Sequence, residues 1–115
     1  METLQEFMLL FRMEPSNEQP TQEQLQEMEK QWGQFIGNIA MQGKLVSTYQ
    51  LGFEGNKISS NQTIDNGFLI AENQMLAGNM VLKANSLEVA TDLAKNCPIL
   101  FMGGSVEVRT ITPMN

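Results

Sequence analysis

The sequence predicts a single α+β domain whose strands and helices follow a split β-α-β order, with both helices on one face of the sheet. Three observations predict this class. The 115 residues are 42% hydrophobic and 17% charged, which is enough apolar material for one packed core. Two segments repeat apolar residues at spacings of three and four, as amphipathic helices do. The segments before, between and after them have the two-residue alternation of strands.

The first strand is expected at residues 5–13, where both faces are largely apolar. A strand of this composition is typical of the interior of a sheet. A polar loop with proline near each end follows at residues 14–20. Thr21 and Gln24 then have the three-residue spacing of a capping box, which predicts that a helix starts here.

This first helix is expected to run from about residue 22 to about residue 42. Gly43 follows it, in the position where glycine commonly ends a helix. Gly33 and Gly37 lie at the edge of its apolar stripe, and we expect another backbone to approach the helix closely there. The stripe consists of Leu25, Met28, Trp32, Phe35, Ile36 and Ile39.

The middle of the chain is expected to form a strand at residues 44–53 and a weak, polar edge strand at residues 57–64. The Glu-Gly-Asn sequence at residues 54–56 predicts a hairpin turn between them. The Asp-Asn-Gly sequence at residues 65–67 predicts a second turn. Residues 68–74 have no pattern that favours either helix or strand.

The last third of the chain predicts a strand at residues 75–84, a helix capped by Ser86, and a final strand at residues 103–111. Pro98 is expected to stop the helix. The complete order is that of a ferredoxin-like βαββαβ sandwich with an added hairpin. Right-handed crossovers would place the first and last strands near the centre of the sheet.

The alternation divides the sheet residues between two faces. The face expected to meet the helices carries Phe7, Leu9, Phe11, Leu76, Met80, Leu82, Val106 and Val108. The second face mixes apolar bulk with charge and carries Met8, Leu10, Arg12, Val81, Glu107, Arg109 and Ile111. A monomer rarely leaves such an apolar patch bare, so we expect a homodimer in which two sheets pack face to face.

Composition excludes several function classes. The formal net charge is −6, which argues against nucleic-acid binding. The single cysteine excludes an intrachain disulfide, and no basic leader or run of about 20 apolar residues indicates export or a membrane span. We therefore expect a cytoplasmic protein. Histidine, the commonest neutral-pH base and metal ligand, is absent, and no metal site or cofactor is predicted.

Several segments, taken in order, resemble the YCII-related proteins, and the DGPF-type branch of that family in particular. The resemblance covers nearly the whole chain, residues 1–115, as one domain. It implies ferredoxin-like protomers that pack sheet to sheet as a dimeric α/β barrel. The segments that carry it are FMLLFR at 7–12, Trp32 with Gly33, QGKLV at 42–46, DNGF at 65–68, and CPIL followed by GGSVEVRTI at 97–111.

Two features depart from that family. The branch signature Asp-Gly-Pro-Phe is replaced by Asp-Asn-Gly-Phe at residues 65–68, so the proline is missing. Some members of the wider family resemble cofactor-free enzymes with a His-Asp pair, and a chain without histidine cannot use that mechanism. The resemblance otherwise implies little about activity.

Four charged residues are candidates for a site. Glu107 and Arg109 could bind a polar ligand, with Arg12 beside them, or could form only a solvated ion pair. Asp65 could act as a base at a cavity rim, or could bond its own backbone as an Asx-turn residue. Cys97 is expected to be a small core residue.

These residues leave three hypotheses for function. The first is a homodimer that binds a small molecule in a cavity at the sheet face, through Arg12, Asp65, Glu107 and Arg109. The second is a cofactor-independent enzyme, an isomerase or lyase, with Asp65 or Glu107 as base. The third is a regulatory module that binds another protein.

Overall fold

A computed structural model describes residues 4–15 and 20–114 of the protein. Within these residues the chain forms two α-helices, α1 (Gln22–Met41) and α2 (Leu87–Ala94), and a short 3-10 helix, η1 (Pro98–Met102). The strands are β1 (Gln5–Met13), β2 (Leu45–Gln50), β3 (Asn56–Ile58), β4 (Ile64–Asn66), β5 (Ile70–Ala71), β6 (Gln74–Ala84) and β7 (Ser105–Thr110).

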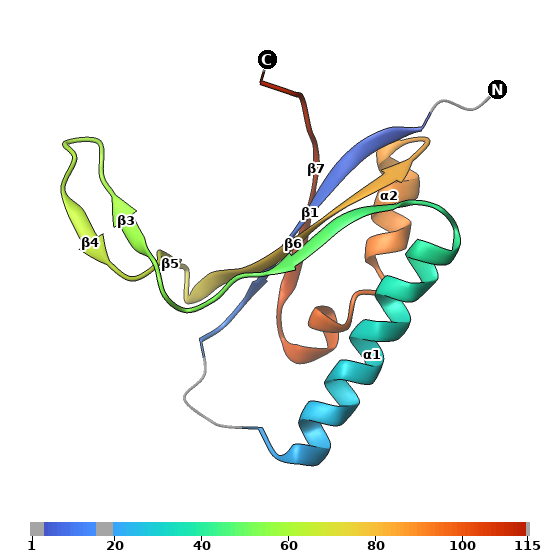
Figure 1. Ribbon diagram of the computed structural model, residues 1–115, viewed down its shortest axis with the longest axis horizontal. Helices are drawn as coiled ribbons and strands as arrows, with labels where there is room; N and C mark the ends of the chain where they lie inside the picture. The colour runs from blue at the N-terminus through green and yellow to red at the C-terminus, as the bar shows by residue number, and fades with distance from the viewer. Residues whose placement is uncertain (1–3, 16–19, 115) are drawn as a thin grey trace.

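The main sheet has the strand order β2-β6-β1-β7, and the short β5 also pairs with β6. All of these pairings are antiparallel. Both helices lie on the same side of the sheet, which confirms the predicted α+β class (Figure 1). β1 is interior, as predicted, but β7 is an edge strand, so the expectation that the last strand lies near the centre was wrong.

The ends of α1 are set by the residues that the sequence indicated. The Thr21 side chain accepts a hydrogen bond from the Gln24 backbone, and the Gln24 side chain accepts one from Thr21, which completes the capping box. Gly43 adopts a positive φ of 70° directly after the helix. Of the loop predicted at 14–20, residues 16–19 lie outside the described residues.

Within the described residues of one subunit, no backbone makes the close approach predicted at Gly33 and Gly37. A Cβ atom added at either glycine would meet no atom within 4 Å in the described part of the chain. The close approaches occur at two other glycines instead. A Cβ at Gly78 on β6 would lie 2.6 Å from the carbonyl oxygen of Tyr49, and one at Gly104 would collide with the carbonyl oxygen of Arg12.

The two turns predicted in the middle of the chain were also wrong. Residues 54–56 do not form a hairpin turn between β2 and the next strand. Instead β3 pairs with β4, and the turn of that hairpin lies at residues 59–63. At this turn the Asn61 side chain accepts a hydrogen bond from the Thr63 backbone. The β3–β4 hairpin projects from the end of the main sheet, and we call residues 53–68 the arm (Figure 1).

Two bulges interrupt the predicted alternation. Phe11 pairs with Gly78 but Arg12 pairs with Leu76, so Ala77 is an extra residue on β6. This bulge moves Leu76 to the face of Arg12, opposite to the face that the alternation predicted. A second bulge on β2, at Val46, separates Leu45 from Ser47 in the same way.

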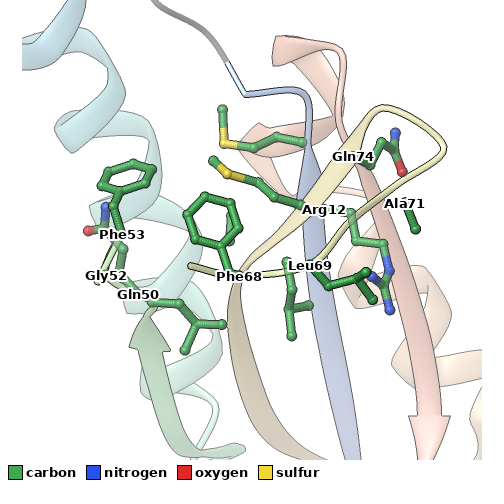
Figure 2. A pocket seen from close by; sticks show the side chains of 13 residues that line it. Arg12, Gln50, Gly52, Phe53, Phe68, Leu69, Ala71 and Gln74 are labelled. Atoms are coloured by element: carbon green, nitrogen blue, oxygen red, sulfur yellow. The ribbon is translucent and has the colours of Figure 1, made fainter. Parts of the chain in front are cut away.

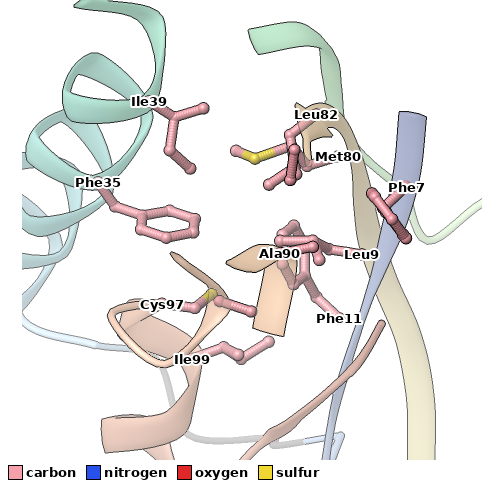
Figure 3. Close-up of a cluster of buried hydrophobic side chains, with 12 residues drawn as sticks. Phe7, Leu9, Phe11, Phe35, Ile39, Met80, Leu82, Ala90, Cys97 and Ile99 are labelled. Atoms are coloured by element: carbon pink, nitrogen blue, oxygen red, sulfur yellow. The ribbon is translucent and has the colours of Figure 1, made fainter. Parts of the chain in front are cut away.

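The core lies between the helices and one face of the sheet (Figure 3). Phe7, Leu9 and Phe11 of β1 are at most 3% exposed. The Trp32 ring meets the rings of Phe11 and Phe35 edge-on, at centroid distances of 5.2 and 6.0 Å. Apart from Leu76, the predicted helix-facing set is therefore buried or packed against the buried cluster.

Candidate functional site

The second face of the sheet is not covered by the helices, and we call it the open face. The strand pairings place on it residues that are half-buried or exposed in the subunit. It is formed by Glu6, Met8, Leu10, Arg12, Ser47, Tyr49, Leu76, Asn79, Val81, Lys83, Ser105, Glu107 and Arg109. Tyr49, on the edge strand β2, leaves 66% of its surface exposed.

Three of the four predicted site residues meet on this face. Arg109 Nη1 donates a hydrogen bond of 3.1 Å to Glu107 Oε1. Arg12 Nη2 lies 3.8 Å from Glu107 Oε2, which is an ion-pair distance but longer than a hydrogen bond. One carboxylate is thus shared by two guanidinium groups, and the group of three carries one net positive charge.

The fourth predicted residue, Asp65, does not join this group within one subunit. It lies on β4 of the arm, where it is exposed and pairs across the hairpin with Lys57. The Asx turn of this region belongs to Asn61, four residues earlier. Both sequence-based interpretations of Asp65 assumed a turn at residues 65–67, and the hairpin register replaces that turn with a strand.

A cavity of about 390 Å³ lies where β1 ends, β6 begins and the chain leaves β2. Figure 2 shows Phe53 and Phe68 on one side of it and Arg12 and Gln74 on the other. Its walls are mostly apolar, and Arg12 is the charged residue among them. The complete lining is Arg12, Met13, Gln50, Leu51, Gly52, Phe53, Phe68, Leu69, Ala71, Gln74, Met75, Leu76 and Ala77.

The base of the arm forms one wall of this cavity. The Phe53 and Phe68 rings lie 6.2 Å apart, and the Gly67 amide donates a hydrogen bond of 2.7 Å to the Gly55 carbonyl. On the opposite wall, the lining residues Ala71 and Gln74 flank Glu72 and Asn73, which both have positive φ values and make the tight turn between β5 and β6. The sequence reasoning missed this wall because it left residues 68–74 unassigned; the Glu-Asn pair before Gln74 was the available turn signal.

Cys97 is completely buried in the core, as predicted. Burial raises the pKa of its thiol to about 11, although a backbone hydrogen bond involving Ile99 lowers it in part. The thiol is therefore protonated at neutral pH and is a poor nucleophile. Within residues 4–15 and 20–114, no three acidic or cysteine side chains cluster as metal ligands would.

The helices in the described part of the chain are too short or too polar to span a membrane. The chain matches no protein-family model and no curated protein sequence.

Proposed function

We propose that this protein is a homodimer that assembles through its open face and binds a small molecule in the cavity beside that face. The observation that carries the proposal is the amount of surface that one subunit leaves exposed. A compact monomer of 12.9 kDa exposes about 6,300 Å². This subunit exposes 8700 Å², an excess of about 2,400 Å².

The shape of the subunit agrees with that excess. Its radius of gyration is 15.9 Å, against about 13 Å for a compact domain of this length, and its shortest extent is only 20 Å. Obligate homodimers bury about 1,000–2,500 Å² on each subunit. A second copy on the open face is therefore of the right size to cover the excess.

Charge also favours a second copy as the occupant of the open face. The whole chain carries −6, and copies with that charge repel each other. The charged residues of the open face instead sum to +1, and both signs are present for pairing across an interface. They are Glu6, Arg12, Lys83, Glu107 and Arg109.

The arm supports the same assembly. An isolated two-stranded hairpin is marginally stable in water. Ile58 and Ile64 pair on one face of the arm, yet they are 68% and 64% exposed. A partner subunit that covers these two side chains would supply the packing that the arm lacks.

The strand order β2-β6-β1-β7, with a crossover helix after β1 and another after β6, is consistent with a ferredoxin-like sheet. Two such sheets packed face to face would form the dimeric α/β barrel of the YCII-related proteins. We propose membership of that family on this topology and on the segments that resemble it.

Light scattering coupled to size-exclusion chromatography tests the dimer. Wild-type protein should have twice the 12.9 kDa subunit mass at micromolar concentration. Tyr49→Asp, which charges an exposed position of the open face, should shift the mass to one subunit. Leu25→Asp is the matched control, because Leu25 is 44% exposed on α1, away from that face, and this variant should remain dimeric.

Two results would contradict the proposed interface. One is a wild-type mass of a single subunit at all concentrations, and the other is a Tyr49→Asp variant that remains as dimeric as Leu25→Asp. Circular dichroism of each variant establishes that the fold is retained. Methyl NMR of Met13 and Met75, which line the cavity, tests small-molecule binding separately from assembly.

A further inference from the structure

We infer that the cavity selects a small monoanion with an apolar body, such as an aryl-alkyl carboxylate, and that Arg12 is its anchor. This inference rests on the proposed small-molecule binding and adds the chemical class of the ligand. It depends on three features of the cavity: its volume, the composition of its walls, and the incomplete pairing of the one charged side chain in its lining.

The volume and walls define the body of the ligand. A cavity of about 390 Å³ lies at the small end of the range that holds organic ligands, about 300–1,000 Å³. The Phe53 and Phe68 rings and the Met13 and Met75 side chains line it, and these favour an aromatic or aliphatic body. Met75 is only 6% exposed, so part of the lining is already shielded from water.

Arg12 defines the charge of the ligand. Its guanidinium carries five N–H donors, and among the described residues its ionic contact is with Glu107 at 3.8 Å. Glu107 makes its shorter contact, 3.1 Å, with Arg109 on the other side. Donors of Arg12 therefore remain for a carboxylate, which guanidinium binds in a bidentate fashion.

The surroundings of Arg12 add to this preference. Arg12, Glu107 and Arg109 together carry one net positive charge, on a chain whose net charge is −6. The two amide side chains of the lining, Gln50 and Gln74, are neutral and can donate or accept. A second anionic group on the ligand would find no further cation in the lining, so the site favours a monoanion over a dianion.

A matched pair of probes tests this selection: 3-phenylpropanoate and 3-phenylpropan-1-ol, which share the body and differ in charge. Binding is measured by titration of protein labelled at the methionine methyl groups. Met13 and Met75 report on the cavity, and Met41 at the end of α1, which is 90% exposed, serves as the reference. The carboxylate should shift Met13 and Met75 selectively and bind at least about tenfold more tightly than the alcohol.

Arg12→Gln should weaken carboxylate binding at least about tenfold and leave alcohol binding within about twofold. The retained alcohol binding then shows that the cavity is intact. Lys30→Gln is the control for general loss of positive charge, because Lys30 is an exposed cation on α1, outside the cavity lining and away from the open face; it should leave both probes unchanged.

Equal affinity for the two probes at Met13 and Met75 would overturn the anion selection and leave small-molecule binding standing. A loss of carboxylate binding in Arg109→Gln but not in Arg12→Gln would overturn Arg12 as the anchor. Binding of neither probe to the wild-type cavity would overturn both this inference and the proposed small-molecule binding, whereas the oligomeric state is decided independently by its own mass measurement.

Discussion

Glycine-to-alanine substitutions at two positions should change stability in opposite directions. At Gly33, inside α1, an added Cβ would meet no atom within 4 Å. Gly33→Ala should therefore raise the free energy of unfolding by the full difference in helix propensity between alanine and glycine, about 1 kcal/mol. At Gly78, the Cβ would lie 2.6 Å from the Tyr49 carbonyl oxygen and 3.5 Å from the Phe11 ring.

The Gly78→Ala contact cannot be relieved by a side-chain rotation, because the nearest atom belongs to the backbone of β2. β2 would have to move away from β6, and overpacking of this kind costs about 1–3 kcal/mol. For a chain of this length, 1 kcal/mol corresponds to about 4 °C in Tm. Gly33→Ala should raise Tm by about 4 °C, and Gly78→Ala should lower it by about 4–12 °C.

Thermal melts followed by circular dichroism, at one fixed protein concentration, measure both shifts. The concentration must be constant because dimer formation makes Tm depend on it. A lower Tm for Gly33→Ala would refute the statement that this side of α1 is open, and would indicate that a partner packs there. An unchanged Tm for Gly78→Ala would refute the tight contact between β2 and β6.

Three further outcomes are expected. Thr21→Ala should lower the free energy of unfolding by about 1 kcal/mol in urea titrations through loss of the α1 cap, whereas Thr21→Ser should retain it; equal losses would argue against the capping box. Burial raises the Cys97 pKa from 9.0 to about 11, so the unfolded chain ionises first as pH rises. The free energy of unfolding should then fall more between pH 9 and 11 in the wild type than in Cys97→Ala, and parallel pH profiles would contradict this. The double variant Ile58→Ser, Ile64→Ser should weaken the dimer in sedimentation experiments while Lys57→Ser, on the other face of the arm, should not; equal effects would rule out the apolar face as the contact.

The candidate site was only partly accessible to sequence reasoning. Arg12, Glu107 and Arg109 could be assigned to one face because β1 and β7 pair without a bulge between Phe7 and Arg12. The cavity could not be predicted, because its walls come from chain segments that are distant in sequence and irregular in backbone. Phe53 and Phe68 come together only when the arm closes at the Gly55–Gly67 hydrogen bond.

The sequence was sufficient to predict the features that are set by interactions between residues close together in the chain. The caps at Thr21 and Ser86, the helix end at Gly43, and the buried alternation of Phe7, Leu9 and Phe11 each follow from neighbours a few residues apart. The tertiary structure alone decided the bulge at Ala77, the pairing of β3 with β4, and therefore the face of Leu76 and the place of Asp65. The physical reason is that strand register is set by hydrogen bonds to a partner strand, and the partner of β6 at this point is β1, more than sixty residues earlier in the chain.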